Sequence, residues 1–119
     1  MKKNINIAVV GLGQVGIYLL NELNNKKKEI KLKTGKIINV VAVSARSISK
    51  IRKFKVNKKI FFKNPLEIFN KTKVEILFEA IGMSDGISKK VVETALKNKV
   101  HVITPNKALI SNMVIIWES

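Results

Sequence analysis

The chain carries the sequence INIAVVGLGQVG at residues 5–16. Its first six residues are mostly β-branched and apolar, which is typical of a short strand buried on both faces. Beyond the glycines, apolar side chains recur at helical spacing, at Val15, Leu19, Leu20 and Leu23. This spacing predicts a helix to about Asn25, with those side chains as its buried stripe. A strand is therefore expected to pass through a glycine-rich turn directly into a helix.

Three glycines in this stretch, Gly11, Gly13 and Gly16, have the G-x-G-x-x-G spacing of a dinucleotide-binding turn. The first permits a tight turn, the second lets a pyrophosphate approach the backbone, and the third lets the helix pack against the strand. Free N–H groups at the helix start carry about half a positive charge and would face the phosphates. The motif alone is weak evidence, but its position between strand and helix favours dinucleotide binding over a plain connecting turn.

Later apolar runs predict four more strands, at residues 37–43, 60–62, 74–81 and 100–104. The lysine-rich segment 26–36 ends in Thr34-Gly35 and is interpreted as a loop. Segment 44–59 is charged and lacks a clean period, so a loop with one helical turn is expected there.

Three further helices are expected between and after these strands. A short helix should span residues 64–69, with Pro65 in the first turn, where its missing N–H costs little. Another should follow Ser84, which can cap it, and a third should begin at residues 106–110. The buried stripe of the helix after Ser84 is predicted to be Val91, Val92, Ala95 and Leu96. Alternating strands and helices predict an α/β fold, a Rossmann-like doubly wound parallel sheet with right-handed crossovers.

The formal charge of +15 raises the question of a nucleic-acid partner. The basic residues are nearly all lysine, with arginine only at Arg46 and Arg52, and they are spread over residues 26–36, 50–63 and 89–99. Only Phe54, Phe61 and Phe62 stand among them, too few aromatic residues for a base-stacking surface. A solvated basic face is therefore favoured over nucleic-acid binding, with a modest attraction for anionic cofactors.

Other chemistry is sparse. The chain has no cysteine, so it can form no disulfide or thiolate metal site, which suits a reducing compartment. His101 is the sole histidine and has no ligand partners nearby in sequence, so no metal site is expected. No apolar run approaches a secretory signal or a membrane span, and a cytoplasmic protein is expected. Several carboxylates show no paired spacing for acid–base work: Glu67, Glu75, Glu79, Asp85 and Glu93.

The end of the second predicted strand bears on the choice between NAD and NADP. Where an acidic residue would bind the ribose 2′-hydroxyl of NAD, residues 43–47 contain only Val, Ser, Ala, Arg and Ser. A serine and Arg46 would suit the 2′-phosphate of NADP, so NADP is favoured over NAD. A plain surface role for Arg46 remains the alternative.

Four segments together narrow the family, at residues 9–16, 41–46, 79–82 and 104–109. Their order and spacing closely resemble the N-terminal domain of homoserine dehydrogenases, from residue 5 to about residue 111. The glycine motif is common to many dehydrogenases, whereas the block Thr-Pro-Asn-Lys-Ala-Leu at residues 104–109 is far more specific. The resemblance implies an NAD(P)-dependent oxidoreductase that reduces aspartate semialdehyde to homoserine, on the route to threonine and methionine.

The same resemblance implies a set of site residues. Cofactor contacts are expected from the glycine turn and from the ends of later strands: Gly11, Leu12, Gly13, Gln14, Val15, Gly16, Arg46, Ala80, Ile81, Gly82, Thr104, Asn106 and Lys107. Lys107 matches the family's lysine beside the nicotinamide and the substrate, so it is the expected catalytic residue. An ammonium there could polarise a carbonyl or donate a proton as hydride arrives.

The sequence also departs from the family pattern. Met83 stands where the family commonly has glycine, and Pro105 where many members have alanine. The family continues into a substrate and dimerisation domain that supplies a second lysine, acidic substrate contacts and a metal-ion site. Residues 1–111 are therefore interpreted as a single incomplete NAD(P)-binding domain, and residues 112–119 as a non-family tail. Without that further domain, the chain is expected to bind its dinucleotide but to lack a substrate, turnover and the family's oligomer contacts.

Two alternatives remain beside this interpretation. A stand-alone nucleotide-sensing module, such as the regulatory Rossmann domains of potassium transporters, typically has an acidic residue after the second strand, which this chain lacks. The cofactor half of another dehydrogenase is the nearer alternative.

Overall fold

The computed structural model of the chain describes residues 3–45, 58–81 and 86–104. Its strands are β1 (Asn4–Val10), β2 (Ile37–Ser44), β3 (Phe61–Phe62), β4 (Ile76–Glu79) and β5 (His101–Ile103). Its helices are α1 (Gln14–Thr34), α2 (Ile68–Lys71) and α3 (Gly86–Lys97), with 3-10 turns η2 (Lys58–Ile60) and η3 (Pro65–Glu67). The strands form one sheet in the order β3-β2-β1-β4-β5, and every pairing is parallel.

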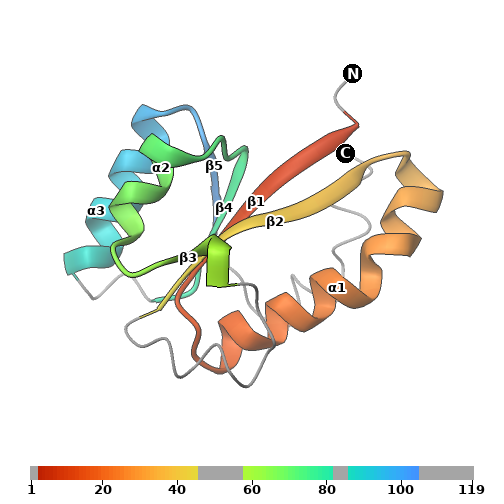
Figure 1. The fold of residues 1–119 in the computed structure, drawn as a ribbon, viewed down its shortest axis with the longest axis horizontal. Helices are drawn as coiled ribbons and strands as arrows, with labels where there is room; N and C mark the ends of the chain where they lie inside the picture. Colours follow the sequence, from red (N-terminus) through yellow and green to blue (C-terminus); the bar gives the residue numbers. More distant parts are fainter. Residues whose placement is uncertain (1–2, 46–57, 82–85, 105–119) are drawn as a thin grey trace.

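Helices cover both faces of this sheet (Figure 1), with α1 on one face and α2 and α3 on the other. Alternate residues of β1 pack on opposite faces of the sheet, because successive side chains of a strand point to opposite sides. Ile7 and Val9 pack in a cluster with Leu19 and Leu23 of α1, whereas Ala8 and Val10 belong to a cluster with residues of α2 and α3. The predicted α/β fold, a Rossmann-like doubly wound parallel sheet, is confirmed.

Helix α1 is nine residues longer than predicted, since the helix expected to end near Asn25 continues to Thr34. The prediction of a loop at 26–36 was wrong because lysine is a good helix former and the apolar pattern persists at Ile30, which is fully buried. Ion pairs one turn apart also support this part of the helix, with Lys33 Nζ 3.3 Å from Glu29 Oε1. Gly35 ends the helix in the left-handed conformation, where its N–H donates to the Lys31 carbonyl.

Two other details differ from the sequence predictions. Val15 and Leu96 were expected in buried stripes, but Val15 is 36% exposed and Leu96 is 60% exposed. Val91 and Ala95 of the predicted α3 stripe are buried as expected, and Ser88, one turn before Val91, is buried with them. The predicted strand 74–81 is confirmed over the shorter range of β4. Ser84, most of the predicted loop 44–59 and the helix at 106–110 lie outside the described residues.

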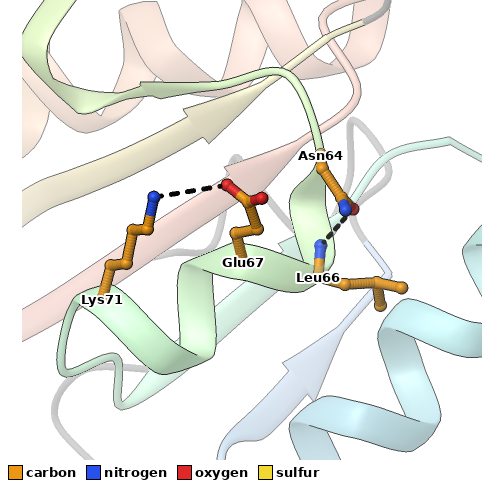
Figure 2. A network of polar contacts seen from close by, with 4 residues as sticks. All are labelled: Asn64, Leu66, Glu67 and Lys71. Carbon is orange, nitrogen blue, oxygen red and sulfur yellow. Dashed lines mark hydrogen bonds and ion pairs between the residues drawn. The ribbon is translucent and has the colours of Figure 1, made fainter.

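The short helical segment after β3 begins as its sequence predicts. The Asn64 side chain accepts a hydrogen bond from the Leu66 N–H at 3.0 Å, and Pro65 occupies the first turn of η3 (Figure 2). One turn further, the Lys71 ammonium lies 3.5 Å from the Glu67 carboxylate. The cap holds Pro65, which is buried, at the carboxyl-terminal edge of the sheet. In the part of the chain described, no helix combines the length and apolar character needed to cross a bilayer.

Candidate functional site

A cavity of about 360 Å³ opens at the carboxyl ends of β1, β2 and β4. Residues from five segments line it: Val10, Gly11, Leu12, Gly13, Ser44, Ala45, Lys63, Pro65, Ala80, Ile81 and Ile87. In the strand order, β1 and β4 are neighbours although β2 and β3 intervene in sequence. The chain therefore reverses its winding direction between β1 and β4, which is where open α/β sheets bind ligands.

Gly11 is fixed by its neighbours on both sides. Its N–H donates to the Ser44 carbonyl at the end of β2, at 2.8 Å. Its φ is +98°, and a Cβ there would lie 2.8 Å from the Ala80 carbonyl carbon and 2.9 Å from the Ile81 nitrogen. Any side chain would therefore meet both a strained backbone conformation and the exit of β4. The tight turn that the first glycine predicts is present.

The other two glycines of the motif differ sharply in their surroundings. A Cβ on Gly16 would lie 1.8 Å from the Gly11 carbonyl oxygen, so α1 can approach the turn only with glycine there. A Cβ on Gly13 would meet no protein atom within 4 Å. Gly13 lines the cavity, and its neighbouring space is open. The third glycine therefore serves packing, while the second leaves a cradle that a side chain would fill.

The start of α1 supplies backbone donors to the same region. The Ile17 N–H donates to the Gly13 carbonyl at 3.0 Å and begins the helical ladder. The N–H groups of Gln14, Val15 and Gly16 precede that bond and so have no intrahelical acceptor. No side chain caps this end, and its first turn contains no acidic residue. Together with the open space at Gly13, these donors fit a diphosphate at the helix start.

Two residues of the cavity that the sequence analysis missed, Lys63 and Pro65, follow the short strand β3. β3 pairs with the end of β2, with Ser44 opposite Phe62. Residues that follow the two strands therefore reach the same edge, and Lys63 lines the cavity with Ser44 and Ala45. Phe61-Phe62 is a recognisable apolar run, so the rule that parallel strands end at one edge could have placed Lys63 here.

Glu79 was dismissed at the sequence level because no second carboxylate stands near it. In the structure its side chain is fully buried at the end of β4. Its Oε1 accepts a hydrogen bond from the Ile81 N–H at 2.8 Å. Ala80 and Ile81, the next two residues, line the cavity. Glu79 thus contacts the cavity wall through the Ile81 N–H and is not itself among the residues that line the cavity.

The predicted site residues fall into three groups. Five of them line the cavity together: Gly11, Leu12, Gly13, Ala80 and Ile81. Gln14, Val15 and Gly16 form the first turn of α1. Thr104, which directly follows β5, is exposed and is not among the residues that line the cavity. Four lie outside the described residues, namely Arg46, Gly82, Asn106 and Lys107. The roles predicted for these residues stay predictions.

Among the described residues, no group of three or more His, Cys, Asp or Glu side chains could hold a metal ion. A second, slightly larger cavity of about 410 Å³ lies at the opposite edge of the sheet. It is lined by the segments that lead into β4 and β5: Phe69, Asn70, Lys71, Thr72, Lys73, Val74, Asn98 and Val100.

The glycine turn, the parallel strand order and the cavity at β1 and β4 agree with comparisons to known proteins. The family described as homoserine dehydrogenase, NAD binding domain, matches residues 11–115. The chain belongs to the homoserine dehydrogenase family. As an NAD-binding domain of that family, it takes a nicotinamide dinucleotide as cofactor, and its relatives are oxidoreductases.

Curated homoserine dehydrogenases from two bacteria illustrate the relationship. The protein from Neisseria gonorrhoeae is 32% identical over 109 residues, which is 92% of this chain and 25% of that protein. The protein from Methylobacillus glycogenes is 30% identical over 111 residues, covering 93% of this chain and 27% of its own length. The chain therefore spans about a quarter of the homoserine dehydrogenases that it matches.

Solved structures of the family share the fold. A Staphylococcus aureus homoserine dehydrogenase superimposes with a TM-score of 0.78 at 29% identity, over 99% of this chain and 31% of that one. The enzyme from Thiobacillus denitrificans gives 0.75 at 28% identity, over 98% of this chain and 27% of that one. The homoserine dehydrogenase fold thus extends over the described sheet and its helices.

Proposed function

We propose that this chain forms the cofactor-binding part of an enzyme that interconverts aspartate semialdehyde and homoserine with a nicotinamide dinucleotide. The observation that carries the proposal is the open space at Gly13, beside the first-turn amides of α1 and within a cavity at the β1–β4 junction. A diphosphate bound there gains hydrogen bonds from backbone donors that the fold leaves without intrahelical partners. The bound dinucleotide supplies or accepts the hydride, while the chain orients it.

We further propose that the chain prefers NADP over NAD. The segment after β2, residues 43–47, contains no acidic residue to bind a ribose 2′-hydroxyl. Lys63 lines the cavity with Ser44 and Ala45, so a lysine borders the region where the adenosine ribose of a Rossmann cofactor is expected. Lys63 supports the preference that Arg46 first suggested, because a second cation would favour a 2′-phosphate.

The catalytic step is proposed to use Lys107, which by resemblance corresponds to the family's lysine beside the nicotinamide and the substrate. Its ammonium would polarise the aldehyde oxygen and donate a proton to it as hydride reaches the carbonyl carbon. Residues that bind the substrate and join subunits are proposed to come from the part of such enzymes that this chain does not span. Membership in threonine and methionine biosynthesis stays a prediction from the family resemblance, and cytoplasmic location stays a prediction from the sequence itself.

The test is a titration of the purified 119-residue chain with NADPH and with NADH, followed by a homoserine oxidation assay. We expect saturable binding with a lower Kd for NADPH, a rise in the thermal midpoint on binding, and no turnover by this chain alone. Absence of binding by either dinucleotide would contradict the cofactor role. Equal affinities, or tighter NADH, would contradict only the NADP preference, and turnover would contradict the need for further residues.

A further inference from the structure

Among the residues that the structure describes, Glu79 has the most deeply buried ionisable side chain near the cavity. Its side chain has no exposed surface, although it lies at the end of a strand beside a ligand cavity. Burying a carboxylate is costly unless hydrogen bonds replace its water. One such bond comes from the Ile81 N–H, two residues further along the chain, at 2.8 Å.

This bond controls how the chain leaves β4. The Ala80 N–H donates to the Val10 carbonyl at 2.8 Å and so continues the β1–β4 pairing by one residue. The next N–H, that of Ile81, turns instead to the side chain of Glu79. A side chain that accepts from the backbone two residues later stabilises a turn in place of further strand. Glu79 therefore fixes the orientation of the Ala80–Ile81 peptide.

The position of that peptide matters to the cavity because it packs directly against the glycine turn. A Cβ on Gly11 would lie 2.8 Å from the Ala80 carbonyl carbon and 2.9 Å from the Ile81 nitrogen. Ala80 and Ile81 also form part of the cavity wall opposite Ser44 and Ala45 in the strand order. A small rotation of this peptide would either press on the glycine turn or change the wall that faces the ligand.

We propose that Glu79 is a positioning residue for the dinucleotide, acting through the Ala80–Ile81 wall without touching the cofactor itself. The proposal rests on the cofactor-binding function proposed above. The wall belongs to the β4 side of the cavity, whereas the adenosine end is expected near β2 and Lys63. Loosening the wall should therefore weaken binding of the whole dinucleotide more than binding of its adenosine diphosphate part.

The chain offers a matched control in Glu75. Its Oε2 accepts a hydrogen bond from the Asn6 N–H at 2.9 Å, which is the same kind of contact as that of Glu79. Glu75 precedes β4 and therefore lies at the opposite edge of the sheet from the cavity. Removing the Glu75 acceptor should lower the stability of the fold without changing the affinity for the dinucleotide or for ADP.

The experiment titrates the full 119-residue chain and its variants with ADP and with whichever of NADPH and NADH the wild type binds more tightly. Thermal midpoints are measured without ligand. Glu79→Met should weaken dinucleotide binding about tenfold and ADP binding less than about threefold, since an unsatisfied Ile81 N–H releases the wall. Glu79→Gln keeps an acceptor oxygen and should remain within about threefold of wild type for both ligands. Glu75→Met should lower the thermal midpoint while leaving both affinities unchanged.

Three outcomes would overturn the inference: unchanged dinucleotide affinity in Glu79→Met, equal losses for ADP and dinucleotide, or a loss in Glu79→Gln as large as in Glu79→Met. If Glu79→Met does not fold, Glu79→Leu takes its place, since a branched apolar side chain of similar volume also removes the acceptor from the Ile81 N–H. It should show the same selective loss, and a parallel loss for ADP would contradict the proposal. A wild-type chain that binds neither dinucleotide would refute the proposed function itself, and with it this inference.

Discussion

The two edges of the parallel sheet make an instructive pair. At the carboxyl-terminal edge, a cavity of about 360 Å³ is bordered by the glycine turn and the start of α1. At the amino-terminal edge, a cavity of about 410 Å³ is bordered by Lys71 and Lys73. Each edge also has a glutamate that accepts a backbone N–H, Glu79 at one and Glu75 at the other.

Cavity size, the presence of lysines and a glutamate that accepts a backbone N–H therefore do not separate the two edges. What separates them is backbone chemistry. Only the carboxyl-terminal cavity lies beside first-turn amides without intrahelical acceptors, at a glycine with open space around its Cα. In a parallel α/β sheet, the helix that follows a strand begins at this edge. The partial positive charges of helix N-termini are therefore concentrated there. The comparison predicts that changes at the two edges have different consequences.

The largest effect is expected from Gly16→Ala, which tests whether the carboxyl-terminal edge needs close packing of α1. The new Cβ would overlap the Gly11 carbonyl oxygen, so we expect a loss of about 3 kcal/mol in the free energy of unfolding. Urea denaturation measures this loss. Gly86→Ala is the control, because a Cβ at the start of α3 meets no atom within 4 Å. Similar stability of the two variants would contradict the packing role.

Gly13→Val should separate binding from folding at the same turn. The added side chain meets no protein atom near its Cβ, and Gly13 has a backbone conformation that valine can adopt, with φ −79° and ψ −163°. We therefore expect a thermal midpoint within a few degrees of wild type. Affinity for NADPH should fall about 100-fold, or about 2.7 kcal/mol, because the valine fills the phosphate cradle. Calorimetric titration gives the Kd, and unchanged affinity would remove the main support for the proposed function.

A pair of lysines compares the two cavities directly. Lys63→Ala should weaken NADPH binding about tenfold and NADH binding far less, since only NADPH has a 2′-phosphate for the ammonium to contact. Lys71→Ala, which removes the same charge from the amino-terminal cavity, should change neither affinity. The ratio of the two Kd values for each variant is the measurement. Equal effects of both lysines would mean that net positive charge, rather than position, sets the affinity.

The sequence predicted the features that depend on local pattern and missed those that depend on pairing between segments. The β1-turn-α1 unit was recognisable because its buried strand, its three glycines and Leu19 and Leu23 are contiguous. Lys63 was missed because its place depends on a two-residue strand pairing with the end of β2. Glu79 was missed because a partner was sought among other carboxylates, whereas its partner is the backbone two residues away.

The extra turns of α1 were missed for a different reason. Between Leu23 and Ile30 no residue is fully buried, so the helical repeat of apolar residues is interrupted in the segment where lysines are most frequent. Polar composition suggested a loop, yet lysine and glutamate favour a helix when one buried residue per two turns anchors it. Gly35 marked the true end, since its left-handed φ of 75° is the usual helix terminator.

The smallest effect is expected from Asn64→Ala, which probes how far the carboxyl-terminal edge depends on its outer wall. The asparagine oxygen accepts the Leu66 N–H and sets the first turn of η3, in which Pro65 lines the cavity. Loss of the cap should cost about 1 kcal/mol of stability, and Asn64→Asp should restore it because a carboxylate accepts the same bond. NADPH affinity should fall no more than about twofold, since Pro65 contributes shape but no charge. A loss of affinity as large as that of Lys63→Ala, restored by Asn64→Asp, would show that the ligand depends on the η3 wall rather than on the helix-start amides.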